Sequence, residues 1–470
     1  MEQGNQLTAA AVRAAFAGAA DFQERHIAPQ GRRGFVFFLD GLTAAASIAD
    51  FLLHPAVQAL HGSAADMVEQ CLEGSVWAAV ARPADNLAAA TDYLLSGFAV
   101  LLFEGCGRAV AFEMKSGDKR AVAPPSVEHT VKGAKDAFTE VLRVNTTLLR
   151  RHLRSEKLQL REVIVGKTSR TRVAVVWLQG AADETVAEQM LRRLTTVETD
   201  SFITPAAVEE AVSGARWSAF PLLRFTERAD RFAQAMAAGK VGLLVDGLPL
   251  GYLAPVALGD FLASPEDEGV DFVTASCIRV LRYAAALLSL ILPALYAAMA
   301  TFHQEMIPTK LLHAIIESKA QVPFPTALEV LGLLIAFEIL QEAGVHLPQS
   351  LGQAVSIIGG LVVGSAAVEA RLISPAALIV VAVAGVAGYV IPGRELANAL
   401  RVWRFLLAGA ACAAGLFGLS VAFLALLLHL GGLNTFGLGY LRPFDRGTTG
   451  GSILRRRTVL PPHSSQGGPA

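Results

Sequence analysis

The sequence predicts an α/β region of two similar lobes followed by an all-α, multi-span transmembrane domain. Two observations favour this fold class. Strand–turn–helix patterns recur through the first half of the chain, whereas long apolar runs fill the second half. Hydrophobic residues make up 53% of the 470 residues, charged residues 17%, and the mean hydropathy is +0.46. The hydrophobic share and the mean hydropathy exceed those of a typical soluble protein, and the charged share is lower than usual. The length calls for two or three units.

Changes in composition divide the chain into five predicted segments. They are a mixed-charge lead-in (1–33), a first α/β lobe (34–129), a second α/β lobe (130–275), a helical membrane domain of four or five spans (276–432) and a flexible basic tail (433–470). The first thirty residues carry charges throughout and lack the apolar core of a cleavable signal. We therefore expect the two lobes to stay in the cytoplasm.

The two lobes are predicted to be a duplication. In the first lobe, a buried strand GFVFFLDG opens at Gly34, and a helix at about Asp85–Ser96 leads into a hairpin of Ala99–Gly105 and Arg108–Met114. VVWLQG in the second lobe matches VFFLDG at a constant offset of 139, and GKVGLLVDG matches GFAVLLFEG at an offset of 142. The alternative is coincidence between common strand–turn patterns.

After the hairpin of the first lobe and before VVWLQG of the second, the stretch Ala134–Arg154 has the pattern of an amphipathic helix. This helix ends in Arg150, Arg151 and Arg154. Such an arginine cluster could bind an anionic partner or lipid headgroups. The simpler explanation, which we favour, is a solvated helix C-terminus where cations are favourable.

The membrane domain is expected to begin after a turn at Ser264–Asp267. Prolines should break its helices, at Pro293, Pro323, Pro325, Pro348 and Pro375, the last with Ser374 as N-cap. The predicted spans are Tyr283–Thr301, a marginal or re-entrant segment with Glu329 and Glu338, Ser350–Val368, Pro375–Ile391 and Phe405–Leu428, with an interfacial stretch at His303–Gln321.

The charge pattern gives conflicting indications of orientation. Arg279 and Arg282 place the start of the first span inside. The loop that carries Arg394, Arg401 and Arg404 and the tail that begins near Arg442 are both basic. One span between them cannot leave both on the same side, so one of these signals must mislead.

The predicted span Ser350–Val368 carries small residues at intervals of four, and residues four apart lie on one face of a helix. A face of small side chains lets a second helix approach closely in lipid. We expect it to be a packing face for self-association, formed by Gly352, Ser356, Gly360 and Gly364.

Catalytic chemistry is not expected. The sequence has neither a phosphate-binding P-loop motif nor an H-E-x-x-H zinc motif, and its four cysteines are isolated. We expect no enzymatic activity, no cofactor and no metal site, and a net charge of −1 gives no reason for a nucleic-acid partner.

Carboxylates beside the apolar spans are the candidate functional residues, because they are costly in lipid and face protein or water. Glu329 and Glu338 could attract cations in a pore, or they could be structural. Glu342 and Glu369 are more simply placed at the water interface. Gln353 and Ser356 add polar atoms that could line an ion path or bond a neighbouring helix.

Nearly the whole chain resembles the A subunit of bacterial spore nutrient-germinant receptors, the GerA family. The likeness lies in motifs that keep a fixed order: VKGAKDAF, RVNTTLLRR, VGKTSRTRVAVV, TERADR, GLLVDGLP, SPED, TFHQEMIPTKLL, PFPTALE, FEILQEAGVHLP, GQAVSIIGGLVVG and AAVEARLISP. The resemblance implies a two-lobed cytosolic domain, a multi-span domain in the spore inner membrane, and assembly with B and C subunits. It also implies a nutrient-gated channel for monovalent cations formed by an oligomer of A subunits, with the B subunit as germinant binder.

The resemblance has departures and leaves rivals. Leu334 stands where relatives often carry a second Glu, Ser365 replaces a common Gln, and Glu268 and Gly269 follow SPED where aromatic residues are usual. The missing Glu places charge-based selectivity in doubt. An accessory sporulation channel of the same family (the stage V sporulation protein AF type) and a non-conducting scaffold subunit are the alternatives.

Overall fold

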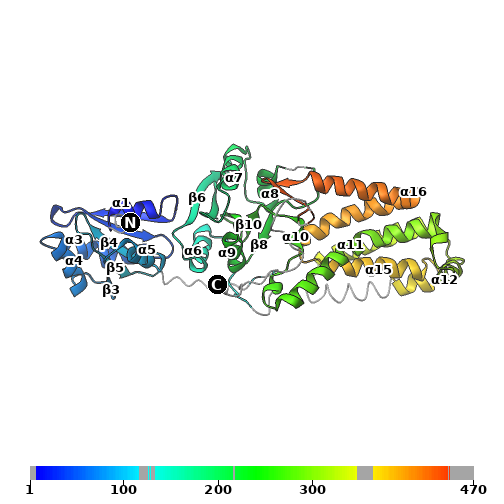
Figure 1. Cartoon of the computed structure of the whole chain (residues 1–470), viewed down its shortest axis with the longest axis horizontal. Coiled ribbons are helices and arrows are strands. Elements are labelled where there is room, and N and C mark those ends of the chain that lie inside the picture. Colours follow the sequence, from blue (N-terminus) through cyan, green and yellow to red (C-terminus); the bar gives the residue numbers. More distant parts are fainter. Residues whose placement is uncertain are drawn as a thin grey trace, which may run out of the picture. The chain divides into compact units, whose positions relative to one another are not determined.

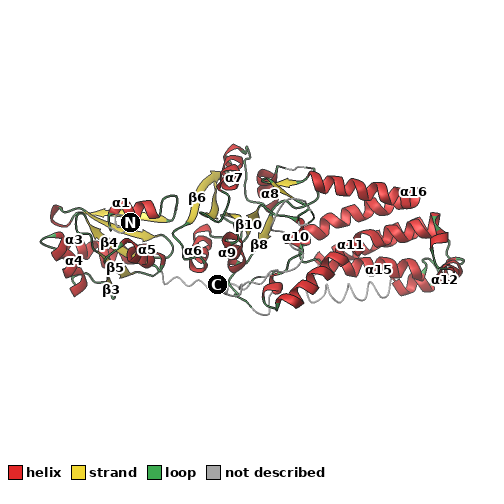
Figure 2. Cartoon of the chain, in the orientation of Figure 1, coloured by secondary structure: helices red, strands yellow, loops and turns green. Residues whose placement is uncertain are grey.

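The computed structural model describes residues 7–115, 133–214, 217–346 and 364–442, with Pro125, Glu128 and Phe444 (Figures 1 and 2). The chain divides into two compact units. Residues 1–216 and 223–255 form the first, which we call the α/β unit. Residues 217–222 and 256–470 form the second, the helical unit. The first sheet already begins within the predicted lead-in, and the division after Pro255 precedes the boundary predicted at residue 275.

The first sheet has the order β1-β2-β4-β5-β3, with every neighbouring pair antiparallel. Its strands are β1 (Phe22–Ile27), β2 (Gly34–Leu39), β3 (Ala81–Ala84), β4 (Phe98–Phe103) and β5 (Ala109–Glu113). Side chains of β4 alternate between the two faces: Ala99 and Leu101 belong to one core, Val100 and Leu102 to the other. This period of two is why an apolar run such as FAVLLF forms a strand that is covered on both faces.

Helices supply the two covers of this sheet. One face is covered by α2 (Ala45–Ile48), a π-helical turn (Ala49–Leu53), α3 (His54–Ala59) and α4 (Ala64–Glu73). The other face is covered by α1 (Ala9–Ala15) and α5 (Leu87–Leu95). N-cap residues set the start of two of these helices. Ser63 and Asp66 form a reciprocal capping box at α4, and Asn86 caps α5.

The second sheet repeats the first, with the order β6-β7-β9-β10-β8. Its strands are β6 (Leu158–Val165), β7 (Thr171–Leu178), β8 (Arg224–Thr226), β9 (Val241–Val245) and β10 (Gly251–Ala254), with α6 (Leu142–His152), α7 (Glu184–Thr196), α8 (Pro205–Ser213) and α9 (Ala229–Ala237). The paired motifs fall on equivalent strands, β2 with β7 and β4 with β9. The predicted pair of similar α/β lobes is therefore confirmed.

The predicted helix at Ala134–Arg154 is too long, because α6 begins only at Leu142. The residues before α6 make other hydrogen bonds. The Phe138 amide donates to the Glu227 carbonyl, and the backbone of Thr139 bonds the side chain of Asn145 in α6. The Asp246 carboxylate then accepts from the Leu142 amide, so it fixes the start of the helix.

The arginines at the end of α6 do not form one solvated cluster. Arg151 is exposed, but the Arg150 side chain is only 1% exposed and makes two hydrogen bonds of 2.8 Å to Asp21, which is equally buried. Asp21 lies in the segment just before β1, and the backbone of Ala19 and Ala20 in that segment pairs with Leu160 on β6. The segment predicted as a separate lead-in is therefore part of the fold, because its residues 19–21 tie the first lobe to the second.

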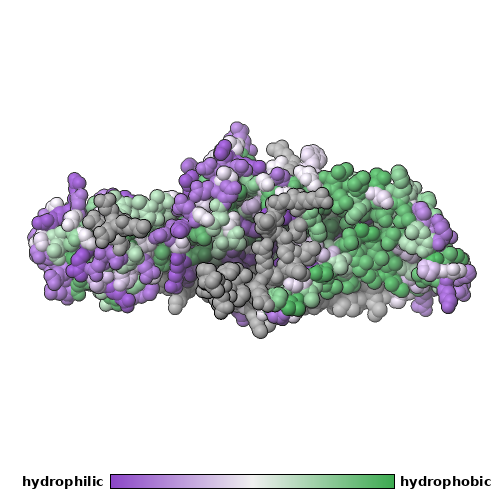
Figure 3. Space-filling model, viewed as in Figure 1, coloured by the Kyte–Doolittle hydropathy of each residue, from purple (hydrophilic) through white to green (hydrophobic). Residues whose placement is uncertain are grey.

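The helical unit consists of α10 (Leu258–Phe261), α11 (Phe272–Phe302), α12 (Thr309–Lys319), α13 (Thr326–His346), α15 (Pro375–Tyr389), α16 (Arg394–Gly432) and a small hairpin of β11 (Asn434–Thr435) and β12 (Leu438–Gly439). Among the described residues, α11 and α16 are long and apolar enough to cross a membrane, and α15 is a shorter apolar helix. Hydrophobic residues cover much of the visible surface of the helical unit (Figure 3). Its exposed apolar side chains include Leu281, Ile339, Val386, Phe417 and Leu428. The count of four or five spans stays a prediction.

Proline behaves differently at the predicted helix breaks. Pro323 and Pro325 lie between α12 and α13, and Pro375 is the first residue of α15, whose N-cap is Ser374. The break predicted at Pro293 is wrong, because α11 continues through this residue. Neighbouring helices in a membrane bundle can compensate the one backbone hydrogen bond that a proline removes. Pro348 lies outside the described residues.

The run of helical residues in α16 is a hairpin and not the single predicted span at Phe405–Leu428. Ala414 and Gly415 leave helical geometry (φ 59° and ψ −142° at Gly415). The rings of Trp403 and His429 consequently pack at a tilt, with centroids 5.7 Å apart, although a straight helix would separate these residues by about 39 Å. The arms are residues 394–413 and 416–432.

This hairpin removes the conflict between the basic segments. The Gly393 amide, just before the first arm, donates to the Phe261 carbonyl, and Tyr440, just after the second arm, packs on the Phe261 ring. Arg282, in the first half of α11, donates to the carbonyl of Leu262, the residue that follows Phe261. The start of α11, the loop before α16 and the start of the tail therefore lie at one end of the helical unit.

Candidate functional site

The two candidate pore carboxylates lie on α13 and meet different partners. Glu338 forms ion pairs with two arginines of the first α16 arm: its Oε2 lies 3.6 Å from Arg401 Nη1, and its Oε1 lies 3.9 Å from Arg404 Nη1. Arg401 and Arg404 are helical residues and not part of the predicted basic loop. The spacing of three puts both on one face of the arm, opposite α13.

We call Glu338, Arg401, Arg404 and Ser289 the charge cluster. The Arg404 side chain is only 3% exposed, and its Nε and Nη1 have no hydrogen-bond partner among the described residues. The Ser289 hydroxyl of α11 is buried and equally unpartnered within the described part of the chain. A Cβ added to Gly388 would contact both Ser289 Oγ (3.2 Å) and Arg404 Nη2 (3.5 Å), so Gly388 of α15 makes room for this approach.

The charges of this cluster do not balance. One carboxylate faces two guanidinium groups, and the interatomic distances are longer than those of hydrogen-bonded ion pairs. A buried arginine without full compensation is costly, so removing Glu338 would leave a stronger uncompensated charge. In this arrangement Glu338 neutralises arginines of its own chain and is not a free cation ligand.

Glu329 is buried (4% exposed) one turn inside α13. Its Oε2 accepts two hydrogen bonds from Ser374, one from the amide (3.0 Å) and one from the hydroxyl (2.7 Å). Glu329 therefore binds the N-terminus of α15, where the helix dipole favours a negative charge. Its Oε1 has no hydrogen-bond partner among the described residues.

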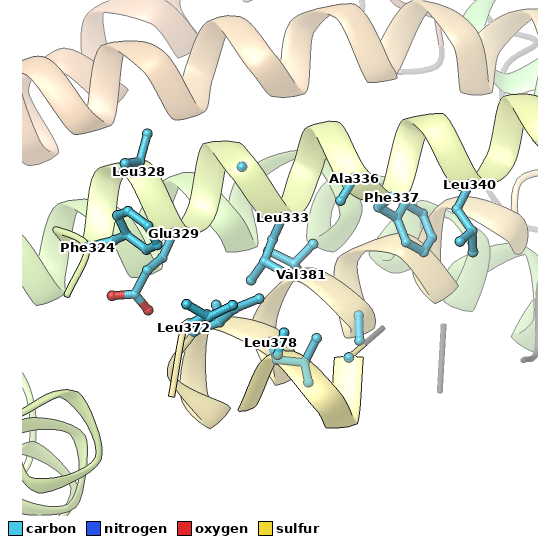
Figure 4. Close-up of a pocket in the computed structure, with 15 residues that line it drawn as sticks. Phe324, Leu328, Glu329, Leu333, Ala336, Phe337, Leu340, Leu372, Leu378 and Val381 are labelled. Atoms are coloured by element: carbon cyan, nitrogen blue, oxygen red, sulfur yellow. The ribbon is translucent and has the colours of Figure 1, made fainter. Parts of the chain in front are cut away.

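A cavity of about 530 Å³ lies beside Glu329, between α13, the segment at 364–372 and α15 (Figure 4). Apolar side chains line it, and Glu329 is the charged residue among them. Figure 4 shows Leu333 and Phe337 of α13 on one side and Leu372, Leu378 and Val381 on the other. The cavity size lies in the range that binds small molecules.

The structure brings some predicted site residues together and leaves others apart. Glu329 and Glu338 have separate surroundings, and Glu342 and Glu369 are exposed. A Cβ added to Gly364 would lie 3.4 Å from the Leu378 side chain of α15. Gln353, Ser356, Gly352 and Gly360 lie outside the described residues. No group of three or more potential metal ligands occurs in the described ranges.

Sequence reasoning missed Arg401 and Arg404 as partners of Glu338, and Ser374 as the partner of Glu329. A signal for the arginines was present: a charged residue inside an apolar helix needs an opposite charge within the bundle. Arg401 and Arg404 adjoin the apolar run of α16, and Glu338 interrupts the apolar run of α13.

The class of protein is defined by two features: a duplicated α/β region, and a helical unit that follows it and contains apolar helices long enough to cross a membrane. The chain belongs to the GerA family: residues 10–460 match the family described as "Bacillus/Clostridium GerA spore germination protein".

Individual relatives agree with this family. Spore germination protein KA of Bacillus subtilis is 34% identical over 408 residues, which cover 87% of this chain and 75% of that protein. The uncharacterized membrane protein YfkQ of the same species is 32% identical over 88% of this chain and 82% of its own length. Spore germination protein A1 is 32% identical over 80% of this chain and 78% of its own length.

Among solved structures, the chain is similar to the crystal structure of the N-terminal domain of the A subunit of the Bacillus megaterium spore germinant receptor GerK3. The sequence identity is 22% and the TM-score 0.41, and the match covers 52% of this chain and 91% of that domain.

Proposed function

We propose that the chain is the membrane subunit of a nutrient-germinant receptor that triggers spore germination, and that it acts without a catalytic step. The observation that carries this proposal is the family match across residues 10–460, together with relatives that are themselves named spore germination proteins. In this proposal the chain assembles with B and C subunits, and the B subunit binds the germinant.

The proposed site of action is the spore inner membrane, with the α/β unit on the cytoplasmic side. Support comes from the basic residues, since the start of α11, the loop before α16 and the start of the tail meet at one end of the helical unit. Basic residues favour the cytoplasmic side, so a single orientation satisfies all three segments.

The finer part of the proposal is an oligomer of this chain that forms a gated path for monovalent cations. Exposed apolar side chains on the helices would contact lipid and neighbouring copies. Because Glu329 and Glu338 are bound by partners inside their own chain, a cation path through either residue requires a rearrangement on opening. The charge cluster would then hold the closed state.

The test is cation release from nutrient-exposed spores in which this chain is the sole receptor subunit of its type. Glu338→Gln should alter release, because Arg401 and Arg404 lose the carboxylate that neutralises them. Glu342→Gln, an exposed position on the same helix, is the matched control. Receptor assembly is measured in parallel, so that loss of the protein is not mistaken for loss of conduction.

Two outcomes separate the alternatives. Altered release with normal assembly supports a conducting subunit that uses the charge cluster. Normal release with normal assembly removes Glu338 from the ion path and favours the non-conducting scaffold. An accessory sporulation channel predicts that deletion of the chain leaves nutrient-triggered release intact.

A further inference from the structure

One oxygen of Glu329, beside the cavity, is not explained by the structural role of this residue in binding the start of α15. Oε2 of Glu329 is satisfied by the two donors of Ser374, but Oε1 is buried with no hydrogen-bond partner among the described residues. Leaving a buried acceptor unsatisfied is costly, and the cost is larger when the acceptor is a carboxylate. A donor supplied by a ligand in the cavity would remove this cost.

The other residues that line the cavity indicate what the remainder of a ligand would be made of. Phe324, Leu333, Phe337, Leu372, Leu378 and Val381 surround the cavity with carbon atoms. A bare metal cation needs several oxygen ligands, and among the described residues of the lining the side chains offer only the carboxylate of Glu329. An ammonium group needs fewer acceptors, and an attached apolar body would fill the cavity.

We propose that this cavity binds a small amphiphilic amine, with its ammonium group at Glu329 Oε1 and its aliphatic or aromatic body between α13 and α15. Binding would connect the start of α13 to the start of α15, which Glu329 and Ser374 already hold together. The proposal concerns binding to the chain itself, so it stands apart from the receptor function proposed above.

The experiment uses the full chain in lipid nanodiscs at neutral pH, with phenethylammonium and 2-phenylethanol as probes that share one apolar body. Binding is measured by ligand-observed NMR, and empty nanodiscs provide the correction for partition into lipid. We expect the amine to bind about tenfold more tightly than the alcohol, because a hydrogen bond between two charged groups is stronger than a neutral one.

Two variants test the site. Glu329→Gln keeps an acceptor for Ser374 but removes the charge, and should abolish the preference for the amine while the alcohol still binds. Gly332→Leu fills the cavity from a position where an added Cβ meets nothing within 4 Å, and should weaken both probes. Thermal unfolding of each variant verifies that it folds.

Equal binding of amine and alcohol to the unmodified chain would overturn the proposal, as would an amine preference that survives in Glu329→Gln. If Glu329→Gln fails to fold, Gly332→Leu decides: a folded variant that binds both probes as well as the unmodified chain excludes this cavity.

Discussion

The rings of Trp403 and His429, one on each arm of α16, pack against each other at a centroid distance of 5.7 Å and an interplanar angle of 37°. The contact is possible only because the chain reverses at Ala414 and Gly415. The reversal turns what composition alone would class as one long span into two antiparallel arms. It also brings the segments on either side of α16 to the same end of the helical unit.

The turn itself depends on Gly415. Its φ of 59° and ψ of −142° are accessible to glycine but strained for other residues, and an added Cβ would lie 2.8–2.9 Å from His303 and Phe302. We expect Gly415→Ala to destabilise the helical unit by ~1–3 kcal/mol. Gly409→Ala, in the same run of helix with open space around it, should instead stabilise by ~0.5–1 kcal/mol. Thermal unfolding in detergent measures both, and equal effects of the two substitutions would contradict this account of the turn.

The hairpin also predicts membrane sidedness. Single cysteines at Pro392 and Gly431, on either side of α16, should react with a membrane-impermeant maleimide from the same side of a vesicle. A cysteine at Glu305, beyond the other end of α11, should react from the opposite side. The four native cysteines are replaced first. Labelling of Pro392→Cys and Gly431→Cys from opposite sides would show that α16 crosses once.

The charge cluster predicts non-additive effects on stability. Arg404→Gln or Glu338→Gln alone leaves a partner charge in the bundle, whereas the double variant removes both. Breaking a buried ion pair from one side costs roughly 3–5 kcal/mol, and Glu338 is partly exposed, so we expect a smaller loss for each single variant. The double variant should be more stable than the sum of the singles implies, by about 0.5–3 kcal/mol. Strict additivity of the unfolding free energies would exclude direct coupling.

The Asp21–Arg150 pair predicts that the two lobes are energetically coupled. Both side chains are almost fully buried and hydrogen-bonded at 2.8 Å, so Asp21→Asn should cost roughly 3–5 kcal/mol. Hydrogen exchange on the full chain should show the loss of protection both in β1 and in β6. Arg151→Gln, an exposed neighbour on α6, is the control and should leave protection unchanged. Loss confined to one lobe would show that the pair does not couple them.

Cys71 predicts a pH dependence of stability. Burial against the first sheet raises the pKa of its thiol to about 12. The folded chain therefore favours the protonated thiol, and this stabilising contribution is complete below the ordinary thiol pKa of about 8.5 and is lost as pH rises from there toward 12. Cys71→Ala should weaken the decline of stability across that window. At pH 8, Cys71 should also resist iodoacetamide in the folded chain and react after denaturation.

The duplicated sheet could be predicted because its central strands are apolar runs that end in Asp-Gly, Glu-Gly or Gln-Gly turns. β1 and β3 were not predicted, because their sequences lack such an apolar run. FQERHI has four consecutive polar residues between its two apolar ends, and ARPA is short and contains proline. Neither sequence therefore has the composition of a buried strand. These strands are defined by pairing with their neighbours.

The candidate site was predicted only in part. Carboxylates inside apolar segments directed attention to Glu329 and Glu338, and both are held in polar contacts. Their partners Ser374 and Arg404 are far along the chain, and nothing in the local pattern links them. The reversal at Gly415 was hidden because the flanking residues (GAACAAGLFGL) are small and apolar, as in an uninterrupted span.

The pairing of residues 19 and 20 with Leu160 has a consequence for how many copies of this chain could be brought together safely. An uncovered strand edge can recruit the edge of another chain, and crowding increases that hazard. On the second sheet, the β6 edge is occupied in part by the chain's own N-terminal segment, and the opposite edge, β8, is only three residues long. The second lobe can therefore be held at high local concentration with little strand edge open to mispairing.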